Sequence, residues 1–281
     1  MSPASGKYGV LEMHFERNSE GRSLLRHLHR EVPMIVQQAL YFDEWLPLLP
    51  CVYILSSGGP HLEGDRYRVE VTLGEGAMAH ISTGAATIIA PMDEDKAELH
   101  QSITLGEGAY LEWLPKPLIP ASRSRYNALS EFEVARSATL FFSEVVACGR
   151  KHRGEMFDYD ELLLSEVVRR PDGEVLSRGG VKIMPRMLSP QRWAFLGNFT
   201  HFGSIVVVTT PEAVAHLSPL LCPRVEDDFR LSVARLRNNG GFALRLAGNN
   251  SERLLAEIRT ICSEVRKCIK GVPLQEEFPW R

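Results

Sequence analysis

The sequence lacks a strong excess of either charge and any long apolar run. Its 281 residues include 32 Lys and Arg against 35 Asp and Glu, which gives a formal net charge of -3. This balance argues against a nucleic-acid-binding protein that works through bulk positive charge. No apolar stretch approaches the ~20 residues of a membrane-spanning helix, and the first residues lack the apolar segment of a signal peptide. We therefore expect a soluble globular protein that contacts neither nucleic acid nor membrane.

Cysteine is scarce and is not arranged for metal or disulfide bonding. The five cysteines stand at positions 51, 148, 222, 262 and 268, and no two have the C-x-x-C spacing. An odd number without that spacing favours small buried apolar side chains over a disulfide framework or a structural zinc site. This usage is typical of a reduced chain, so we predict a cytoplasmic location.

Motifs for catalysis are also missing. The sequence has no Gly-x-Ser-x-Gly, no His-Glu-x-x-His and no paired Asp-x-Asp. His27 and His29 would share one face of a strand and could form a metal pair. With no third ligand nearby, half-exposed strand residues are the preferred interpretation. Other scattered histidines are interpreted as satisfied core or surface residues: His80, His100 and His201.

A repeated glycine turn dominates the remaining pattern. The run Thr72-Leu73-Gly74-Glu75-Gly76-Ala77 returns unchanged as Thr104-Leu105-Gly106-Glu107-Gly108-Ala109. Residues 66–73 alternate strictly between apolar and polar before the first copy, as a half-buried strand does. Residues 132–146 form a weaker third copy. The repetition predicts strand–turn–strand units that stack on their neighbours.

The other elements complete a mainly β prediction. Strands are expected at 8–17, 51–55, 162–169, 174–178, 179–184 and 204–210, and a hairpin around Asn238-Asn239-Gly240-Gly241. A short helix is predicted to begin at Pro211, and a longer one to run from Asn249 or Asn250 to Gly271. We predict one β domain over residues 1–281, built of stacked or curled mixed sheets with about two helices near the C-terminus.

Two carboxylates fall inside strands that are apolar on both faces. Glu112 lies among Tyr110, Leu111, Trp113 and Leu114, and Glu144 lies in an equally apolar segment of the third unit. A buried carboxylate is costly unless it meets a cation, a metal or hydrogen-bond donors. Two interpretations remain open. One is a salt bridge to an arginine, with candidates at Arg123, Arg125 and Arg150. The other is a polar lining for an internal passage, with Asp65 and Glu155 at turns nearby.

The order and spacing of several motifs resemble those of the urease accessory proteins called UreD or UreH. The similarity covers most of the chain and runs through residues 52–59, 63–66, 74–77, 82–87, 111–117, 144–150, 154–155 and 199–203. Ser57 stands where the family more often has a glycine, and residues 277–281 have no clear counterpart, so a docking role for them stays open.

The resemblance implies a non-enzymatic chaperone for nickel insertion into urease. It implies a curled β fold that binds the partner UreF, which recruits the GTPase UreG, in a hetero-oligomer that docks on the urease apoprotein. It further implies a water-filled passage for Ni²⁺. We expect no tightly bound cofactor, since transient nickel suits oxygen ligands better than a closed His/Cys cage. Our hypothesis places Asp65, Glu112, Glu144 and Glu155 along this route.

Two rival functions are compatible with the same residues. The first is a carbohydrate-active enzyme on a stacked β scaffold, with carboxylates such as Asp65 and Glu112 as catalytic groups. The second is a β-rich interaction module without a role in metal transfer. Turnover by the purified chain alone would favour the first. Partner binding without any effect on urease activation would favour the second.

Overall fold

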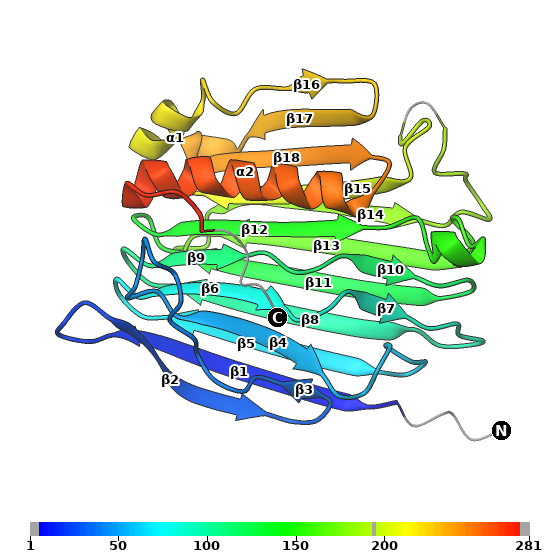
Figure 1. The fold of residues 1–281 in the computed structure, drawn as a ribbon, viewed down its shortest axis with the longest axis horizontal. Helices are drawn as coiled ribbons and strands as arrows, with labels where there is room; N and C mark the ends of the chain where they lie inside the picture. Colours follow the sequence, from blue (N-terminus) through cyan, green and yellow to red (C-terminus); the bar gives the residue numbers. More distant parts are fainter. Residues whose placement is uncertain (1–5, 193–194, 276–281) are drawn as a thin grey trace.

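The computed structural model describes residues 6–192 and 195–275, and the strands in these ranges form two facing sheets (Figure 1). The seven-stranded sheet has the order β14-β13-β11-β8-β5-β1-β2. Nine strands of the eleven-stranded sheet follow the order β16-β17-β18-β15-β12-β9-β6-β4-β3. The other two are β10, which pairs with β12, and β7, which pairs with β10. The mainly β prediction with two helices is confirmed.

The strands of each sheet have the following bounds. The seven-stranded sheet contains β1 (Tyr8–Arg17), β2 (Ser23–Arg30), β5 (Arg66–Leu73), β8 (Ala97–Leu105), β11 (Arg125–Val134), β13 (Glu161–Arg169) and β14 (Val175–Ile183). The eleven-stranded sheet contains β3 (Met34–Ile35), β4 (Cys51–Ser56), β6 (Met78–Thr83), β7 (Thr87–Ile89), β9 (Tyr110–Trp113), β10 (Leu118–Pro120), β12 (Thr139–Val146), β15 (His201–Val208), β16 (Arg224–Val225), β17 (Phe229–Arg235) and β18 (Gly241–Gly248).

The repeated hexapeptide is the turn that carries the chain from one sheet to the other. It joins β5 to β6 and β8 to β9, and in parallel pairing Thr72 lies opposite Thr104. The turns themselves are hydrogen-bonded, because Gly76 N donates to the Glu107 carbonyl at 2.8 Å. The third copy joins β11 to β12 and extends the same stack. The predicted stacking of repeated units is therefore confirmed.

Burial explains why strands of the two sheets differ in sequence. Strands β5, β11 and β13 bury every second residue, because one face of their sheet meets the core and the other meets water. All four residues of β9 are buried, as is nearly all of β12. Helix α2 (Ser251–Lys270) packs on the side of β12, β15 and β18 that faces away from the other sheet (Figure 1).

Both predicted helices are present with the expected ends. Helix α1 (Pro211–Leu217) begins after Thr210, whose hydroxyl accepts a hydrogen bond from Ala213 N. Asn250 caps α2 by accepting from Arg253 N, and Gly271 ends it in the left-handed conformation at φ 75°. The buried face of α2 contains five apolar side chains: Leu254, Ile258, Ile261, Cys262 and Val265.

Two local predictions change in detail. Residues 174–178 and 179–184, predicted as separate strands, form the single strand β14. The hairpin between β17 and β18 is present, but its connection contains the 3-10 turn η2 (Arg237–Asn239).

Other expectations concern membranes, cysteines and chain ends. None of the helices in the described part of the chain is long and apolar enough to cross a membrane. The cysteines are free, and three of them are buried: Cys51, Cys148 and Cys262.

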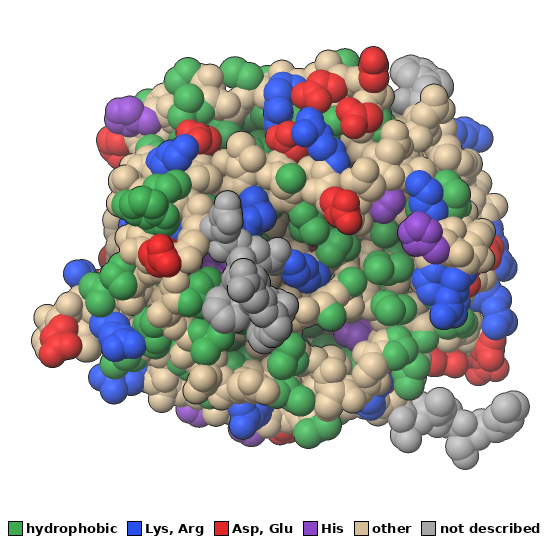
Figure 2. Space-filling view, viewed as in Figure 1, with side chains coloured by type: hydrophobic (Ala, Val, Ile, Leu, Met, Phe, Trp, Pro, Cys, Tyr) green, Lys and Arg blue, Asp and Glu red, His purple; other side chains and the backbone are tan. Residues whose placement is uncertain are grey.

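A second 3-10 turn, η1 (Lys151–Arg153), carries basic side chains near one edge of the face shown in Figure 2. Residues 277–281 lie outside the described ranges, so their docking role stays open.

The stacked turns generate a stability prediction. Gly76 has φ 64°, a conformation that costs other residues about 1–2 kcal/mol, so Gly76→Ala should lower the free energy of unfolding by that amount. Gly74→Ala is the matched control, because Gly74 is not at positive φ and a Cβ there would meet the Phe15 carbonyl oxygen at 3.4 Å. Urea unfolding of both variants measures the difference, and equal losses would contradict the assigned strain.

Candidate functional site

Two cavities lie between the facing sheets and share part of their lining. Cavity 1, about 420 Å³, is bounded by residues of β4, β5, β8, β9, β11 and β12. Cavity 2, about 750 Å³, is bounded by residues of β12, β13, β14, β15, β17 and β18 and by the segment 195–199. Glu144, Val146 and Leu164 line both cavities, so the two spaces meet at these residues.

Glu144 occupies this junction with few internal partners. Its side chain is half-buried, and the Ser204 hydroxyl lies 3.5 Å from Oε2, at the outer limit of a hydrogen bond. Burial raises the pKa of Glu144 to about 7, and the negative charge of Glu166 adds to the effect. The carboxyl group therefore gains and loses its proton near neutral pH, and its ionised form can bind a cation.

Cavity 2 contains a second carboxylate that the sequence analysis did not select. Glu166 on β13 is buried and accepts a hydrogen bond at 2.9 Å from Arg245 on β18, so this ion pair bridges the two sheets. Strand β14 lies close to the Glu166 carboxylate because Gly179 has no side chain. A Cβ at Gly179 would lie 2.5 Å from Glu166 Oε1. Glu166 follows Leu163-Leu164-Ser165, so the signal that selected Glu144 was also present here.

Glu112 is the centre of a buried polar cluster rather than part of either cavity lining. The Arg266 guanidinium from α2 donates from Nε to Oε1 and from Nη2 to Oε2, each at 2.6 Å. The Tyr110 hydroxyl donates to Oε1 at 2.6 Å, and His80 Nδ1 lies 2.8 Å from Oε2. Arg266 also pairs with buried Asp43. Burial alone would raise the pKa of Glu112, but the bonds from Arg266 and His80 lower it to about 2.

Asp65 is fully buried and closes the glycine turn. Its carboxylate accepts hydrogen bonds at 2.8 Å from Lys7 N, Leu62 N and the Tyr67 hydroxyl, and the Lys7 ammonium lies 3.1 Å away. Burial opposes ionisation, but these donors outweigh it and lower the pKa of Asp65. The side chain fixes the path of the chain between Leu62 and Tyr67.

Glu155 stands in a local ion pair. Arg150 donates to its two carboxylate oxygens at 2.7 and 2.5 Å, and Ser122 N donates at 3.0 Å. These bonds, led by that from Arg150, lower the pKa of Glu155. The three arginines proposed as salt-bridge partners of Glu112 and Glu144 pair elsewhere, so that prediction is wrong: Arg150 pairs with Glu155, Arg123 with Asp93 and Arg125 with Asp160.

The four predicted acids therefore occupy different surroundings. Glu144 lines both cavities, and the residues that line those cavities do not include Asp65, Glu112 or Glu155. No local sequence signal could have indicated the Glu112–Arg266 pair, because its members are 154 residues apart. Within residues 6–192 and 195–275, no group of three or more His, Cys, Asp or Glu side chains could hold a metal ion.

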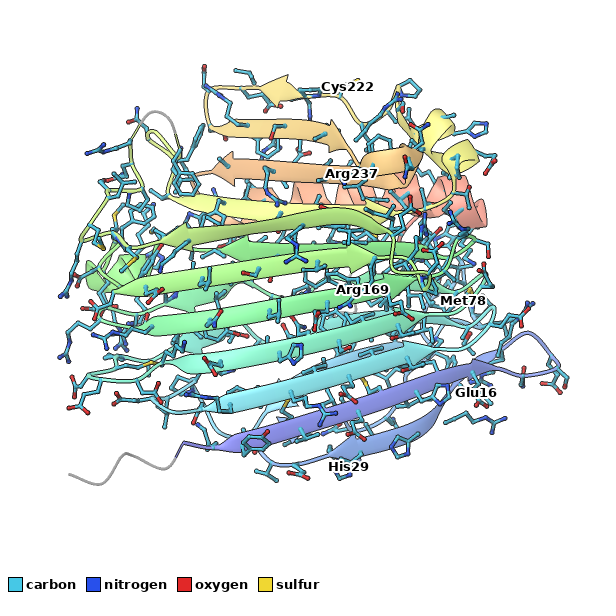
Figure 3. The ribbon with its side chains drawn as sticks, turned by 180° about the vertical axis from the view of Figure 1, so that it is seen from behind. Glu16, His29, Met78, Arg169, Cys222 and Arg237 are labelled. Carbon is cyan, nitrogen blue, oxygen red and sulfur yellow. The ribbon has the colours of Figure 1, made fainter. Side chains whose placement is uncertain are left out.

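The histidines selected from the sequence lie outside the two cavities, and their rings contact oxygen atoms of other side chains. His29 lies on the edge strand β2 with Nε2 3.2 Å from Glu31, and His27 is 3.8 Å from Glu12 (Figure 3). His100 on the outer sheet face contacts Glu131 at 2.9 Å. His201 Nδ1 lies 2.8 Å from the Thr200 hydroxyl. His61, which the sequence analysis did not select, lines cavity 1.

Comparison with known proteins identifies the family. The model of the family described as UreD urease accessory protein matches residues 7–281. The chain is 37% identical to the urease accessory protein UreD 2 of Brucella suis, over 98% of this chain and 92% of that protein. It is 38% identical to the urease accessory protein UreD 3 of Methylorubrum populi, over 99% of this chain and 91% of that protein. The chain belongs to the UreD family of urease accessory proteins.

Membership of the UreD family gives the chain a role in urease maturation. The chain is an accessory protein rather than an enzyme. The resemblance noted from the sequence motifs is thereby confirmed. The geometry also disfavours the rival carbohydrate-active enzyme. Both carboxylates proposed for catalysis, Asp65 and Glu112, are fully buried, and internal donors occupy their oxygens.

The buried cluster around Glu112 generates a pH-dependent prediction. Because the folded-state pKa is about 2 and the ordinary value is 4.5, the charged form stabilises the fold above pH 4.5. This contribution is lost as pH falls from 4.5 toward 2. Glu112→Gln removes the charge opposite Arg266 and should lower the free energy of unfolding at pH 7 by about 3–5 kcal/mol.

Denaturant unfolding at several pH values tests this prediction. The difference between wild type and Glu112→Gln should shrink below pH 4.5. Glu155→Gln is the control, because its ion pair with Arg150 is partly exposed and should contribute about 1 kcal/mol or less. A difference for Glu112→Gln that stays constant from pH 7 to pH 2 would disprove the assigned linkage.

Proposed function

We propose that this UreD-family chain is a urease maturation chaperone that passes Ni²⁺ between its two sheets toward the urease active site. In this proposal it binds UreF, through UreF the GTPase UreG, and the urease apoprotein. Family membership supports the place in urease maturation. The observation that carries the passage is Glu144, a half-buried carboxylate where two cavities between the sheets meet.

The surroundings of Glu144 suit a nickel ion that passes through better than one that stays bound. A resident metal site needs several strong ligands at fixed geometry. Glu144 instead offers one carboxylate beside the Ser204 hydroxyl, and the ion pair of Glu166 with Arg245 lies farther into cavity 2. A hydrated nickel ion would exchange a few water molecules for these oxygens and regain water as it leaves. The chain accordingly needs no tightly bound cofactor.

The remaining predicted acids take supporting roles in this proposal. Glu112 holds α2 on the eleven-stranded sheet through Arg266, and Asp65 shapes the turn that leads into β5. Glu155 orders the loop around η1 through Arg150. Replacement of Glu112 or Asp65 would then act on nickel transfer through the fold, whereas replacement of Glu144 would act on the passage itself. The Arg150–Glu155 pair is partly exposed, so its loss should leave both the fold and the passage intact.

The experiment is nickel loading of urease in cells that co-express the urease subunits, the accessory proteins and this chain. Glu144→Gln keeps the size and polarity of the side chain but removes its charge, so it should lower nickel per urease active site several-fold. UreF should still copurify with the variant. Glu155→Gln, outside the two cavities, is the matched control and should load urease normally.

Three outcomes would count against the proposal. Full nickel loading with Glu144→Gln would remove this residue from the route. Loss of UreF binding together with loss of nickel would assign the effect of the substitution to the partner surface or the fold. Normal urease activation in cells that lack this chain would favour the rival interaction module without a role in metal transfer.

A further inference from the structure

His61 differs from the bonded histidines of this chain. Its ring lines cavity 1, and its Nδ1 is buried without a hydrogen-bond partner among the described residues. His80 and His201 are buried residues, and a side-chain oxygen lies 2.8 Å from Nδ1 in each. A buried polar nitrogen without a partner costs about 1–3 kcal/mol, so a use for it is expected.

The backbone of His61 is fixed on both sides. Its N–H donates to the Ile88 carbonyl at 2.9 Å, and its carbonyl accepts from Ala90 N at 2.8 Å. These bonds form a parallel bridge between His61 and Ile89, next to the end of β7. The residue thus belongs to the sheet framework rather than to a free loop.

The ring is held by its neighbours as well. It packs on the Tyr67 ring with centroids 4.2 Å apart and lies 5.7 Å from the Tyr126 ring. The Tyr67 hydroxyl in turn donates to Asp65, whose carboxylate also accepts from Leu62 N. Asp65 therefore positions His61 through Tyr67 and through the turn. The imidazole is preorganised, which reduces the entropy lost when it binds a ligand.

The electrostatic surroundings keep this imidazole uncharged. Burial is the main cause that lowers the pKa of His61 to about 4, with the charge of Asp65 opposing the shift and the Lys7 ammonium supporting it. At neutral pH one ring nitrogen then carries a lone pair. A neutral imidazole is the form of histidine that binds metal ions.

We propose that His61 is a transient nitrogen ligand for Ni²⁺ in cavity 1 and determines the preference of the passage for nickel over magnesium. This inference rests on the proposed function, because it assigns a residue to the same route. Cavity 1 contains both His61 and Glu144, so an ion held at His61 has a carboxylate ahead of it at the junction with cavity 2.

The chemical reason is the difference between nitrogen and oxygen donors. Carboxylate, hydroxyl and amide oxygens accept Mg²⁺ and Ca²⁺ as well as Ni²⁺, so Glu144, Ser204 and Gln101 discriminate little. Imidazole binds Ni²⁺ far better than it binds these hard cations. A single imidazole with water in the other positions selects the ion without holding it, as a passage requires.

The test uses the purified full-length chain with NiCl₂ or MgCl₂ as the probe. Long-range ¹H–¹⁵N spectra of the histidine rings report contact directly, because paramagnetic Ni²⁺ broadens the signals of rings that bind it. Substoichiometric Ni²⁺ should broaden the His61 signals, identified by their absence in His61→Gln, and Mg²⁺ should leave them unchanged. His100→Gln, on the outer sheet face, is the control variant.

Affinity provides the second measurement. In equilibrium dialysis, His61→Gln should weaken Ni²⁺ binding by at least the roughly tenfold that loss of even an outer-shell partner causes. His100→Gln should bind Ni²⁺ like wild type. In the urease-loading assay, added Mg²⁺ should depress nickel content more with His61→Gln than with wild type. Matching thermal unfolding midpoints for His61→Gln and wild type show that the variant remains folded.

The results separate this inference from the proposed function. Unchanged His61 ring signals in Ni²⁺, or equal Ni²⁺ affinity in the folded His61→Gln variant, would overturn the role of His61. If Glu144→Gln still lowered urease loading in that case, the passage itself would stand. If neither variant affected loading, the passage proposal would fall together with the inference.

Discussion

Parallel stacking of one strand–turn–strand unit is the constraint on which the rest of this structure depends. Each turn sends the chain from the seven-stranded sheet to the eleven-stranded sheet, and neighbouring turns are joined by hydrogen bonds such as Gly76 N to the Glu107 carbonyl. The sheets must therefore face each other along the whole stack, and their inward side chains form two apolar clusters. The cavities lie in the same interval, lined by residues of both sheets.

The third layer depends on a different interaction. Helix α2 covers β12, β15 and β18 with an apolar face, but its last turns also deliver Arg266 to Glu112. An ion pair taken out of water stabilises a fold only when its geometry is good and its remaining atoms are bonded. Here the guanidinium meets two acids, and Glu112 has further partners in Tyr110 and His80. The pair therefore specifies how the helix sits on the sheet.

Along the proposed route, the donors change in kind. His61 in cavity 1 supplies nitrogen, Glu144 at the junction supplies a carboxylate, and Glu166 in cavity 2 is already neutralised by Arg245. None of these positions alone satisfies a nickel ion, which is the physical condition for onward movement. Asp65 belongs to this arrangement indirectly, because it fixes the turn and the tyrosine against which the imidazole packs.

Local patterns in the sequence determined the strands, both helix caps and the stacking of the repeat, because each depends on residues close together in the chain. The sequence also placed Glu112 and Glu144 in apolar strands, and there they look alike. Only the tertiary structure separates them. Arg266, 154 residues away, reaches one carboxylate, while the gap between the two sheets leaves the other beside open space. Whether a buried charge is neutralised or available depends on what packs against it, and that is decided by distant segments.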